Sequence, residues 1–465
     1  MTLDPTLLRD AVAYAEQWVG FRQVHRRVPG IQLAVWHDGE LLSSCAFGQA
    51  DIEADVALTT EHIFRTASHS KSFTATAVMQ LKEQGKLALD DPLARYIDWI
   101  TTDTPQIADV TIRQVLSHSS GMIRDGSDGD FWQLEFDFPD EQAVREQLRD
   151  SARIFASNTQ FKYSNIAFSM LGLVIAAASG SDYCTYVRDN IIRPLGLSST
   201  GPAFDDRAAA RVCRGYSPEM FGMKRFAFRN SDTRAMSAAA GSYSTASELC
   251  LYFAAHCFGD ERLVSDASKR EMQNQEWKVA GDDVSWYGLG TVIKKVGNRR
   301  LVGGTGGFPG YTTFSLLDPI ERLVVVVLTN AIDAGAGLFA GGVWHIINKA
   351  MTLEPCKVPS PLDSFVGRYF DLFGAFDIAR LGTRLFKLDS AADVPFGDEI
   401  VELAFTSPDT LRVDKGPGYW SPGETFTFDR LGDRVIRVRA EGAMSAYPID
   451  EYERGIKARR LGEAD

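Results

Sequence analysis

The strongest signal in the sequence is Phe64-Arg-Thr-Ala-Ser68-His-Ser-Lys71-Ser-Phe-Thr-Ala75. Apolar residues then recur at helical spacing up to Gly85, a residue typical of a helix end. Ser68 and Lys71 lie on one face of this helix, so the Lys71 amine can approach the Ser68 hydroxyl where the helix N-terminus favours negative charge. The spacing predicts an activated serine nucleophile, although a capping serine followed by a surface lysine has the same spacing.

A second motif, Tyr163-Ser164-Asn165, begins another apolar run with helical spacing. A phenol beside a lysine ammonium loses its proton more easily and can then act as a general base. A buried tyrosine and a helix-capping asparagine are the alternative interpretation. The order and spacing of the two motifs favour the catalytic interpretation, with Ser68, Lys71 and Tyr163 as one unit.

A third motif, Val302-Gly-Gly-Thr305-Gly-Gly-Phe-Pro-Gly310, precedes the apolar strand pair Tyr311–Leu317 and Leu323–Leu328. Glycines in a strand let a substrate backbone come close. The motif predicts an edge strand in which Gly304, Thr305, Gly306 and Gly307 line the site.

These motifs resemble the serine β-lactamase-like and penicillin-binding-protein-like hydrolases, a superfamily that includes class C β-lactamases, D-aminopeptidases and family VIII esterases. The resemblance extends from about residue 31 to residue 330. It implies an α+β fold of the β-lactamase/transpeptidase type, with an antiparallel sheet flanked by helices and an all-helical lobe. Further landmarks that carry it are Leu89-Asp-Asp-Pro92, Thr111-Ile-Arg-Gln-Val-Leu-Ser-His118-Ser-Ser-Gly121, Arg193-Pro-Leu-Gly-Leu197 and Ala240-Gly-Ser-Tyr-Ser-Thr245.

The resemblance also assigns roles in the site. It implies that Asn165 orients Lys71 and the substrate amide, and that the backbone N–H groups of Ser68 and Gly307 form an oxyanion hole. Relatives carry Lys or His as the first residue of the third motif, where this chain has Gly304. Glycine cannot recognise a carboxylate or support proton transfer, so we expect weak or no β-lactamase activity.

The loop Asp125–Asp137 follows the landmark that ends at Gly121 and combines acids with aromatic residues. By family position it can overhang the site. One interpretation is an anionic rim that selects a substrate amino group, and the other is a solvated surface loop. The candidate rim residues are Asp128, Asp130, Trp132 and Glu135.

Two histidines invite a Ser-His-Asp interpretation, but the sequence contains no G-x-S-x-G nucleophile elbow. We expect His118 in a structural turn and His69 as a neighbour of the nucleophile. The glycine-rich third motif lacks the Lys-Ser/Thr ending of a phosphate-binding loop.

The domain organisation follows from a proline-rich segment, Glu354–Pro361, which is typical of an extended spacer. We expect a hydrolase domain in residues 1–353, a linker in 354–361 and a β-barrel domain in 362–465. Beyond the linker, short alternating runs separated by turn residues predict antiparallel strands. This part resembles the lipocalin-like barrel of D-aminopeptidase-type hydrolases, opening at Phe365–Tyr369, and we expect packing or substrate gating from it.

Composition limits the partners. The formal net charge of −12 argues against nucleic acid. The N-terminus lacks the features of a signal peptide, and no apolar run approaches the ~20 residues of a membrane helix, so we expect a cytoplasmic protein without membrane contact. Six scattered cysteines without a C-x-x-C pair suit reduced thiols, and no metal or organic cofactor is implied. A homo-oligomer is compatible with the sequence.

The function that we predict is two-step acyl transfer through an acyl-enzyme on Ser68, resolved by water. The substrate would be a small-molecule or short-peptide ester or amide. Gly304 favours an esterase, whereas the acidic loop and the barrel favour a D-aminopeptidase-like peptidase or amidase. A transacylase with another acceptor and a catalytically impaired ligand sensor are the alternatives.

Overall fold

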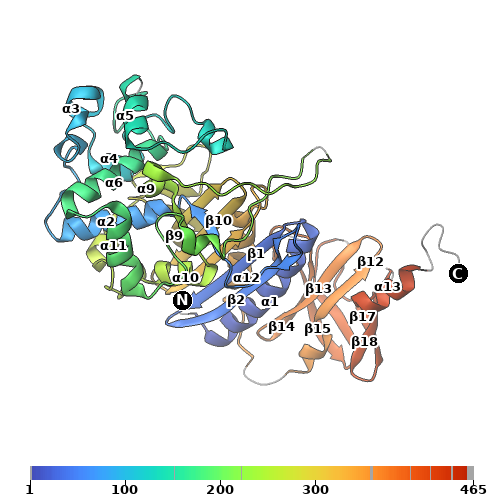
Figure 1. The fold of residues 1–465 in the computed structure, drawn as a ribbon. Coiled ribbons are helices and arrows are strands. Elements are labelled where there is room, and N and C mark those ends of the chain that lie inside the picture. Colours follow the sequence, from blue (N-terminus) through green and yellow to red (C-terminus); the bar gives the residue numbers. More distant parts are fainter. Residues whose placement is uncertain are drawn as a thin grey trace. The chain divides into compact units, whose positions relative to one another are not determined.

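The computed structural model describes residues 3–150, 152–220, 222–356, 360–397, 400–418, 420–440 and 444–457. The chain forms two compact units, one of residues 27–340 and one that combines residues 1–26 with 341–465 (Figure 1). Each unit has its own sheet and its own hydrophobic core.

The unit of residues 27–340 is built on a nine-stranded sheet in the order β3-β2-β1-β11-β10-β9-β8-β7-β6. Its first hairpin turns at Asp38 and Gly39, whose φ values of 41° and 98° suit a tight two-residue turn. In the second hairpin every residue of β11 is buried. The second hairpin is the apolar strand pair predicted from Tyr311–Leu317 and Leu323–Leu328. The strands are β1 (Gly30–His37), β2 (Glu40–Asp51), β3 (Val56–Ala57), β6 (Trp277–Lys278), β7 (Ser285–Tyr287), β8 (Val292–Val296), β9 (Arg299–Phe308), β10 (Tyr311–Asp318) and β11 (Leu323–Thr329).

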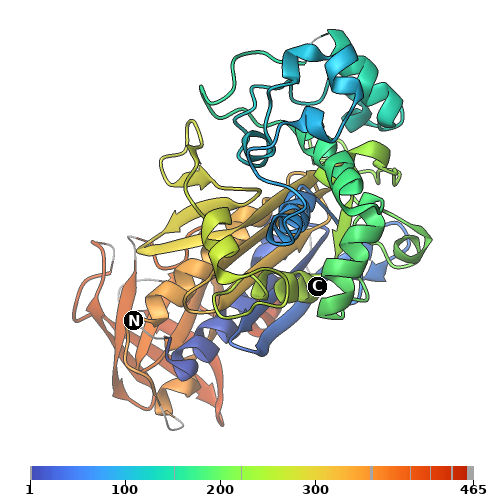
Figure 2. The same ribbon diagram turned by 90° about the vertical axis from the view of Figure 1, so that its left-hand side faces the viewer.

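Helices flank this sheet and form a separate lobe at one end of the unit. Helix α2 is buried from Ser70 to Leu81 and contacts α6 and α9, while α10 lies against β1 and β11. Helices α3, α4 and α5 make up the lobe (Figures 1 and 2). The predicted fold is thereby confirmed. The helices are α2 (Ser70–Glu83), α3 (Trp99–Asp103), α4 (Ile112–Leu116), α5 (Glu141–Asp150), α6 (Asn165–Ser179), α7 (Tyr183–Val187), α8 (Asp206–Ala209), α9 (Ser237–Ala240), α10 (Ala246–Ala254) and α11 (Asp266–Met272).

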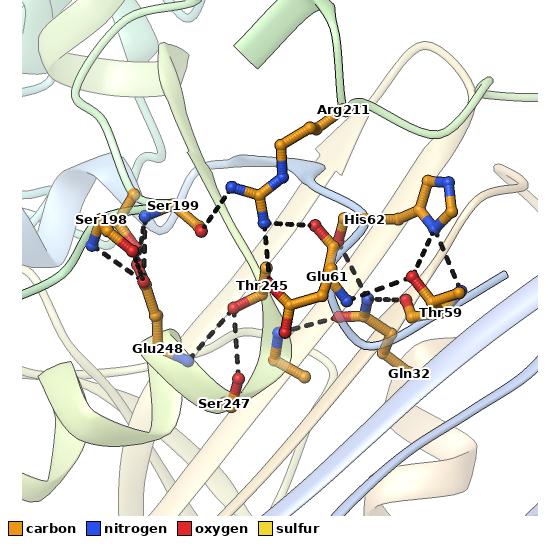
Figure 3. Close-up of polar contacts among 12 residues, drawn as sticks. Gln32, Thr59, Glu61, His62, Ser198, Ser199, Arg211, Thr245, Ser247 and Glu248 are labelled. Atoms are coloured by element: carbon orange, nitrogen blue, oxygen red, sulfur yellow. Dashed lines mark hydrogen bonds and ion pairs between the residues drawn. The ribbon is translucent and has the colours of Figure 1, made fainter. Parts of the chain in front are cut away.

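A polar network fixes the start of α10 to its surroundings (Figure 3). Thr245 caps the helix by accepting the Glu248 N–H. The Glu248 carboxylate in turn accepts the N–H groups of Ser198 and Ser199, each at 2.8 to 2.9 Å. Gln32 of β1 accepts the first N–H of the helix at 2.9 Å. Since these groups have partners, this end of the helix can lie against the sheet at little desolvation cost.

The second unit contains an eight-stranded antiparallel sheet in chain order from β12 to β19. Phe370 and Tyr447 exchange backbone hydrogen bonds of 2.8 and 2.9 Å, which bring the end of the sheet back to its first strand. Phe365, Phe426 and Phe428 belong to its buried core. This is the predicted small barrel, packed with its own side chains. The strands are β12 (Gly367–Asp371), β13 (Gly374–Leu381), β14 (Arg384–Asp389), β15 (Val401–Ser407), β16 (Thr410–Lys415), β17 (Thr425–Leu431), β18 (Arg434–Ala440) and β19 (Ser445–Ala446).

Helix α1 (Pro5–His25) also belongs to the second unit, although the sequence pattern grouped it with the hydrolase domain. The Tyr14 hydroxyl donates to Asp377 Oδ2 of β13 at 3.0 Å, a contact between residues far apart in the chain. The boundary between the units lies within α12 (Ala336–Ala350). Within the predicted linker 354–361, residues 357–359 lie outside the described residues. Helix α13 (Ile449–Lys457) follows the barrel.

No single helix in the described residues is long and apolar enough to cross a membrane. The bent pair Asn165–Ser179 and Tyr183–Leu195 passes that test when the two are counted together, by length and composition. No disulfide joins cysteines within the described ranges.

Candidate active site

Ser68 lies in the turn between β4 (Phe64–Ala67) and α2, where it is half-buried. Its carbonyl accepts the Lys71 N–H at 3.1 Å, so it belongs to the first turn, although the regular α-helix begins two residues later. Ala67 before it has a φ of 47°, a left-handed conformation that is unfavourable for a residue with a Cβ. Ala67 is fully buried and pairs with Ser242 of β5 (Ser242–Ser244), so packing holds the strain. The chain thus presents Ser68 on a sharp strand-to-helix turn.

Lys71 is 1% exposed, and its ammonium donates three hydrogen bonds. The acceptors are Ser68 Oγ at 3.2 Å, Asn165 Oδ1 at 2.7 Å and the Ala239 carbonyl at 2.9 Å. Burial lowers the pKa of Lys71 well below its ordinary value. Once the amine is neutral, its two remaining N–H groups can keep the two shorter bonds, and its lone pair faces Ser68 Oγ. The amine can therefore accept the Ser68 proton.

Tyr163, which lies two residues before the start of α6, also contacts Ser68 Oγ. Its hydroxyl donates to Ser68 Oγ at 2.8 Å, and Lys71 Nζ lies 4.7 Å from the ring centroid. Burial raises the pKa of Tyr163 to about 12, even though its hydrogen bond with Ser68 and the Arg124 cation act in the opposite direction. The sequence led us to expect a phenol that loses its proton more easily. Desolvation outweighs the Arg124 cation, so the phenol stays protonated at neutral pH.

Asn165 is the first residue of α6, a helix that Ser164 caps by accepting the Ala167 N–H. Its amide bridges two charged groups: the carbonyl accepts from Lys71, and Nδ2 donates to Asp125 Oδ1 at 2.7 Å. The structure therefore brings the predicted Asn165 into direct contact with Lys71.

His118 packs its ring against Tyr163, with 4.3 Å between the ring centroids. Its Nδ1 accepts the Ser164 N–H at 3.2 Å, and burial with the nearby Lys71 and Arg124 charges lowers the pKa of His118 well below its ordinary value. The neutral His118 ring therefore holds Tyr163 and Ser164 in place and is not the base of a Ser-His-Asp triad. Among the described residues, no group of three or more His, Cys, Asp or Glu side chains is placed to hold a metal ion.

The third motif lies on β9, beside the β9–β10 hairpin. Phe308 and Tyr311 close a two-residue turn, so Gly307 and Thr312 form the next, non-hydrogen-bonded pair of the ladder. The Gly307 N–H consequently points away from β10. Gly307 is exposed, and a Cβ there would meet no atom within 4 Å. Within the described part of the chain no acceptor receives the Ser68 N–H, so both donors predicted for the oxyanion hole are available.

Gly304 differs from the rest of the motif, because it is buried and faces His69. A Cβ on Gly304 would lie 3.0 Å from His69 Cδ2, while a Cβ on Gly306 would overlap the Thr66 carbonyl oxygen. His69 is fully buried, with Nε2 at 2.9 Å from Ser315 Oγ and Nδ1 at 3.1 Å from the Thr66 carbonyl. The imidazole therefore occupies the space into which a longer side chain at position 304 would extend.

The loop Asp125–Asp137 contributes to the site in a different way from the predicted rim. Trp132 lines the cavity that contains Ser68. Asp128, Asp130 and Glu135 are exposed and do not line it. Since a solvated carboxylate binds an ammonium weakly, these three acids fit the surface-loop alternative.

The cavity at Ser68 has a volume of about 350 Å³. The sequence reading missed two neighbours, Arg124, which lines this cavity, and Asp125 behind it. Arg124 is 65% exposed in its side chain, and its Nε donates to Asp125 Oδ2 at 3.1 Å. The two are adjacent in sequence and follow a recognisable landmark, but only the fold shows that they meet the second motif. The cavity is lined by Ser68, Arg124, Trp132, Tyr163, Asn165, Thr305 and Gly307.

Ser68 lies within hydrogen-bonding reach of a buried lysine and a tyrosine on an α+β fold of the β-lactamase type. This combination defines the class of serine hydrolases with an S-x-x-K nucleophile. The chain belongs to the beta-lactamase family, whose family model matches residues 9–336. It is thus a serine hydrolase of the β-lactamase-like superfamily.

Two relatives and one solved structure illustrate the similarity. The chain is 26% identical over 340 residues to the D-alanyl-D-alanine-carboxypeptidase/endopeptidase AmpH of Escherichia coli (strain K12), a match that covers 70% of this chain and 85% of AmpH. It is 32% identical over 219 residues to the esterase EstB of Burkholderia gladioli, covering 43% of this chain and 55% of EstB. The octameric penicillin-binding protein homologue from Pyrococcus abyssi shares the fold, with a TM-score of 0.66, 22% identity and coverage of 94% of this chain and 99% of that one.

Proposed function

We propose that this chain is an esterase or amidase that forms an acyl-enzyme on Ser68. The observation that carries the proposal is the position of Ser68 Oγ, 3.2 Å from Lys71 Nζ and 2.8 Å from the Tyr163 hydroxyl, at a cavity of about 350 Å³. A serine hydroxyl is a weak nucleophile unless a base takes its proton. Burial lowers the pKa of Lys71 and so favours the neutral amine that can take this proton.

In the acylation step, Ser68 Oγ bonds to the substrate carbonyl carbon while its proton passes to Lys71 Nζ. The bond to the leaving alcohol or amine then breaks, the leaving group takes the Tyr163 proton, and Lys71 returns a proton to Tyr163. Water attacks the acyl-enzyme by the reverse transfers, which release the acid and restore the Ser68 hydroxyl. The N–H groups of Ser68 and Gly307 would hold the oxyanion, each donor contributing a factor of ~10²–10³ in turnover.

The substrate class is a small-molecule or short-peptide ester or amide. The names of EstB and AmpH support ester and peptide substrates respectively. The third motif offers no cation for a β-lactam carboxylate, because its first residue is Gly304. Ester hydrolysis with weak or no β-lactamase activity is therefore the first expectation, and aminoacyl amide hydrolysis is the second.

The experiment that tests the proposal is intact-mass analysis after reaction with a fluorophosphonate, with Ser68→Ala as the matched control. We expect one adduct on the wild type and none on Ser68→Ala, whose melting temperature should stay close to the wild-type value. The same preparation is then given p-nitrophenyl esters, D- and L-aminoacyl anilides and nitrocefin. Labelling of Ser68→Ala, or no labelling of the wild type, would contradict the proposal. Labelling with turnover only in the presence of an added alcohol or amine acceptor would favour a transacylase.

A further inference from the structure

Asp125 does not line the cavity itself, but its carboxylate accepts hydrogen bonds from three residues that do. Oδ1 accepts from Asn165 Nδ2 at 2.7 Å and from Trp132 Nε1 at 2.9 Å, and Oδ2 accepts from Arg124 Nε at 3.1 Å. Its side chain is 14% exposed. The Arg124 carbonyl accepts the Asn165 N–H at 2.8 Å, which fixes this part of the loop to the start of α6. The position of the carboxylate is thus determined by backbone as well as side-chain contacts.

The two ends of the Asn165 amide are chemically different, and their partners decide which end faces which group. A carboxylate can only accept, so Asp125 requires the Nδ2 end. The Oδ1 end is then left for Lys71, at 2.7 Å. A rotated amide would place its carbonyl against the carboxylate, which has no proton to donate. Its NH₂ group would then face Lys71, where it would either meet the ammonium or bind the amine lone pair that Ser68 needs.

The orientation of Asn165 matters for the nucleophile because it also orients Lys71. Two of the three Lys71 hydrogen bonds go to Asn165 Oδ1 and the Ala239 carbonyl, and the third direction leads to Ser68 Oγ. We propose that Asp125 is a positioning residue that fixes the Asn165 amide so that Lys71 keeps its lone pair toward Ser68. This proposal rests on the proposed function of Ser68 as an acylated nucleophile.

Asp125 has a second, electrostatic effect on the same amine. Its negative charge raises the pKa of Lys71, while burial and Arg124 lower it. The charged or titratable groups that face Lys71 are Asp125 and Arg124 from the loop, Tyr163 beside α6 and His118 from the turn after α4. Removing the Asp125 charge alone should lower the pKa of Lys71, so the acid limb of the kcat/KM profile should move to lower pH.

A double-mutant cycle on the full chain tests whether Asp125 acts through Asn165. Asp125→Ala should lower kcat/KM for p-nitrophenyl butyrate about 100-fold, the scale of a small misplacement in an active site. Asn165→Ala should lose a similar factor, and the double variant no more than the larger single loss. Asp125→Asn keeps an acceptor for Asn165, so it should lose less than tenfold and show the shifted acid limb. Asp137→Asn, the same charge change in the same loop but away from the cavity, is the matched control with unchanged rates.

Losses that multiply in the double variant, or wild-type rates in Asp125→Ala, would overturn the proposal. A measurement that needs no turnover separates the positioning role of Asp125 from the proposed function. It follows the Asn165 side-chain NH₂ signal in NMR spectra of protein labelled with ¹⁵N-asparagine, and the signal is assigned by its loss in Asn165→Ala. We expect slow solvent exchange of this signal in the wild type and fast exchange in Asp125→Ala. Unchanged exchange in Asp125→Ala would refute the positioning role, whereas normal exchange behaviour in a wild type that never labels Ser68 would refute only the proposed function.

Discussion

Acid should destabilise the unit of residues 27–340 through His69, which is fully buried behind the nucleophile. Burial lowers the pKa of His69 from 6.5 to about 4. A group whose pKa is lower in the folded state stabilises the protein above the unfolded value of 6.5, and this contribution is lost as the pH falls toward 4. At ~1.36 kcal/mol for each pKa unit, the loss amounts to about 2 kcal/mol at pH 5 and about 3 kcal/mol at pH 4.

The assay compares the wild type with His69→Gln by urea unfolding at pH 7.5 and pH 5. Because two units unfold, the relevant transition is the one that the substitution shifts at pH 7.5. Glutamine does not titrate, so the difference in unfolding free energy between the two proteins should shrink by about 2 kcal/mol at pH 5. Other buried histidines such as His256 titrate in both proteins and cancel in the difference. A difference that is the same at both pH values, or a His69 resonance that titrates near 6.5 in ¹³C-histidine spectra, would refute the reasoning.

Three further predictions concern the site. Lys71→Met and Tyr163→Phe should each lower kcat/KM by a factor of ~10²–10⁴, and near-normal rates in a variant would remove that residue from the mechanism. In the wild type, kcat/KM should rise with pH as Lys71 loses its proton, at a pH below the ordinary lysine pKa. Arg124→Glu should raise the ratio of kcat/KM for cationic over anionic p-nitrophenyl esters about tenfold or more, because Arg124 lines the cavity; an unchanged ratio would mean that the side chain does not face the substrate. Gly306→Ala should lower the unfolding free energy by about 1–3 kcal/mol, because its Cβ would overlap the Thr66 carbonyl oxygen. Gly307→Ala adds a Cβ in open space and should change the unfolding free energy by less than ~0.5 kcal/mol, so equal losses in the two variants would contradict this packing.

The parts of the fold that depend on local patterns could be predicted from the sequence. The turn at Asp38-Gly39 and the apolar run of β11 each have a signature within a few residues, and the three motifs occur in the order typical of the superfamily. The close approach of Ser68, Lys71 and Tyr163 follows from that order, because the fold that it implies brings β4, α2 and α6 together.

The parts that depend on distant contacts could not be predicted. Helix α1 has an ordinary helical pattern, and only its packing near Asp377 assigns it to the unit of the barrel. Asp125 stands in a loop with several acids, and no feature of the sequence distinguishes it from Asp128 or Asp130. The pKa shift of Tyr163 could not be predicted either, since its direction depends on whether burial outweighs the hydrogen bond with Ser68 and the Arg124 charge.

The glycine at position 304 and the histidine at position 69 are best understood together. Gly304 pairs with Ser315 across β9 and β10, and His69 reaches over that pair to bind Ser315 Oγ. A side chain at 304 would compete with the imidazole for this space, so the residue that joins the start of α2 to the sheet also crowds the position where a lysine or histidine would have to extend. If a substrate of this chain carries a carboxylate, Arg124 is a cation at the cavity that can pair with it. Its Cζ lies 5.6 Å from the Tyr163 ring centroid, and its Nε is already held by Asp125. The guanidinium fork is thereby oriented while its remaining donors stay exposed, which is the geometry that favours a planar anion. The absence of the third-motif lysine therefore changes where an anionic group can be recognised, whereas the proton transfers that we propose at Ser68 need only Lys71 and Tyr163.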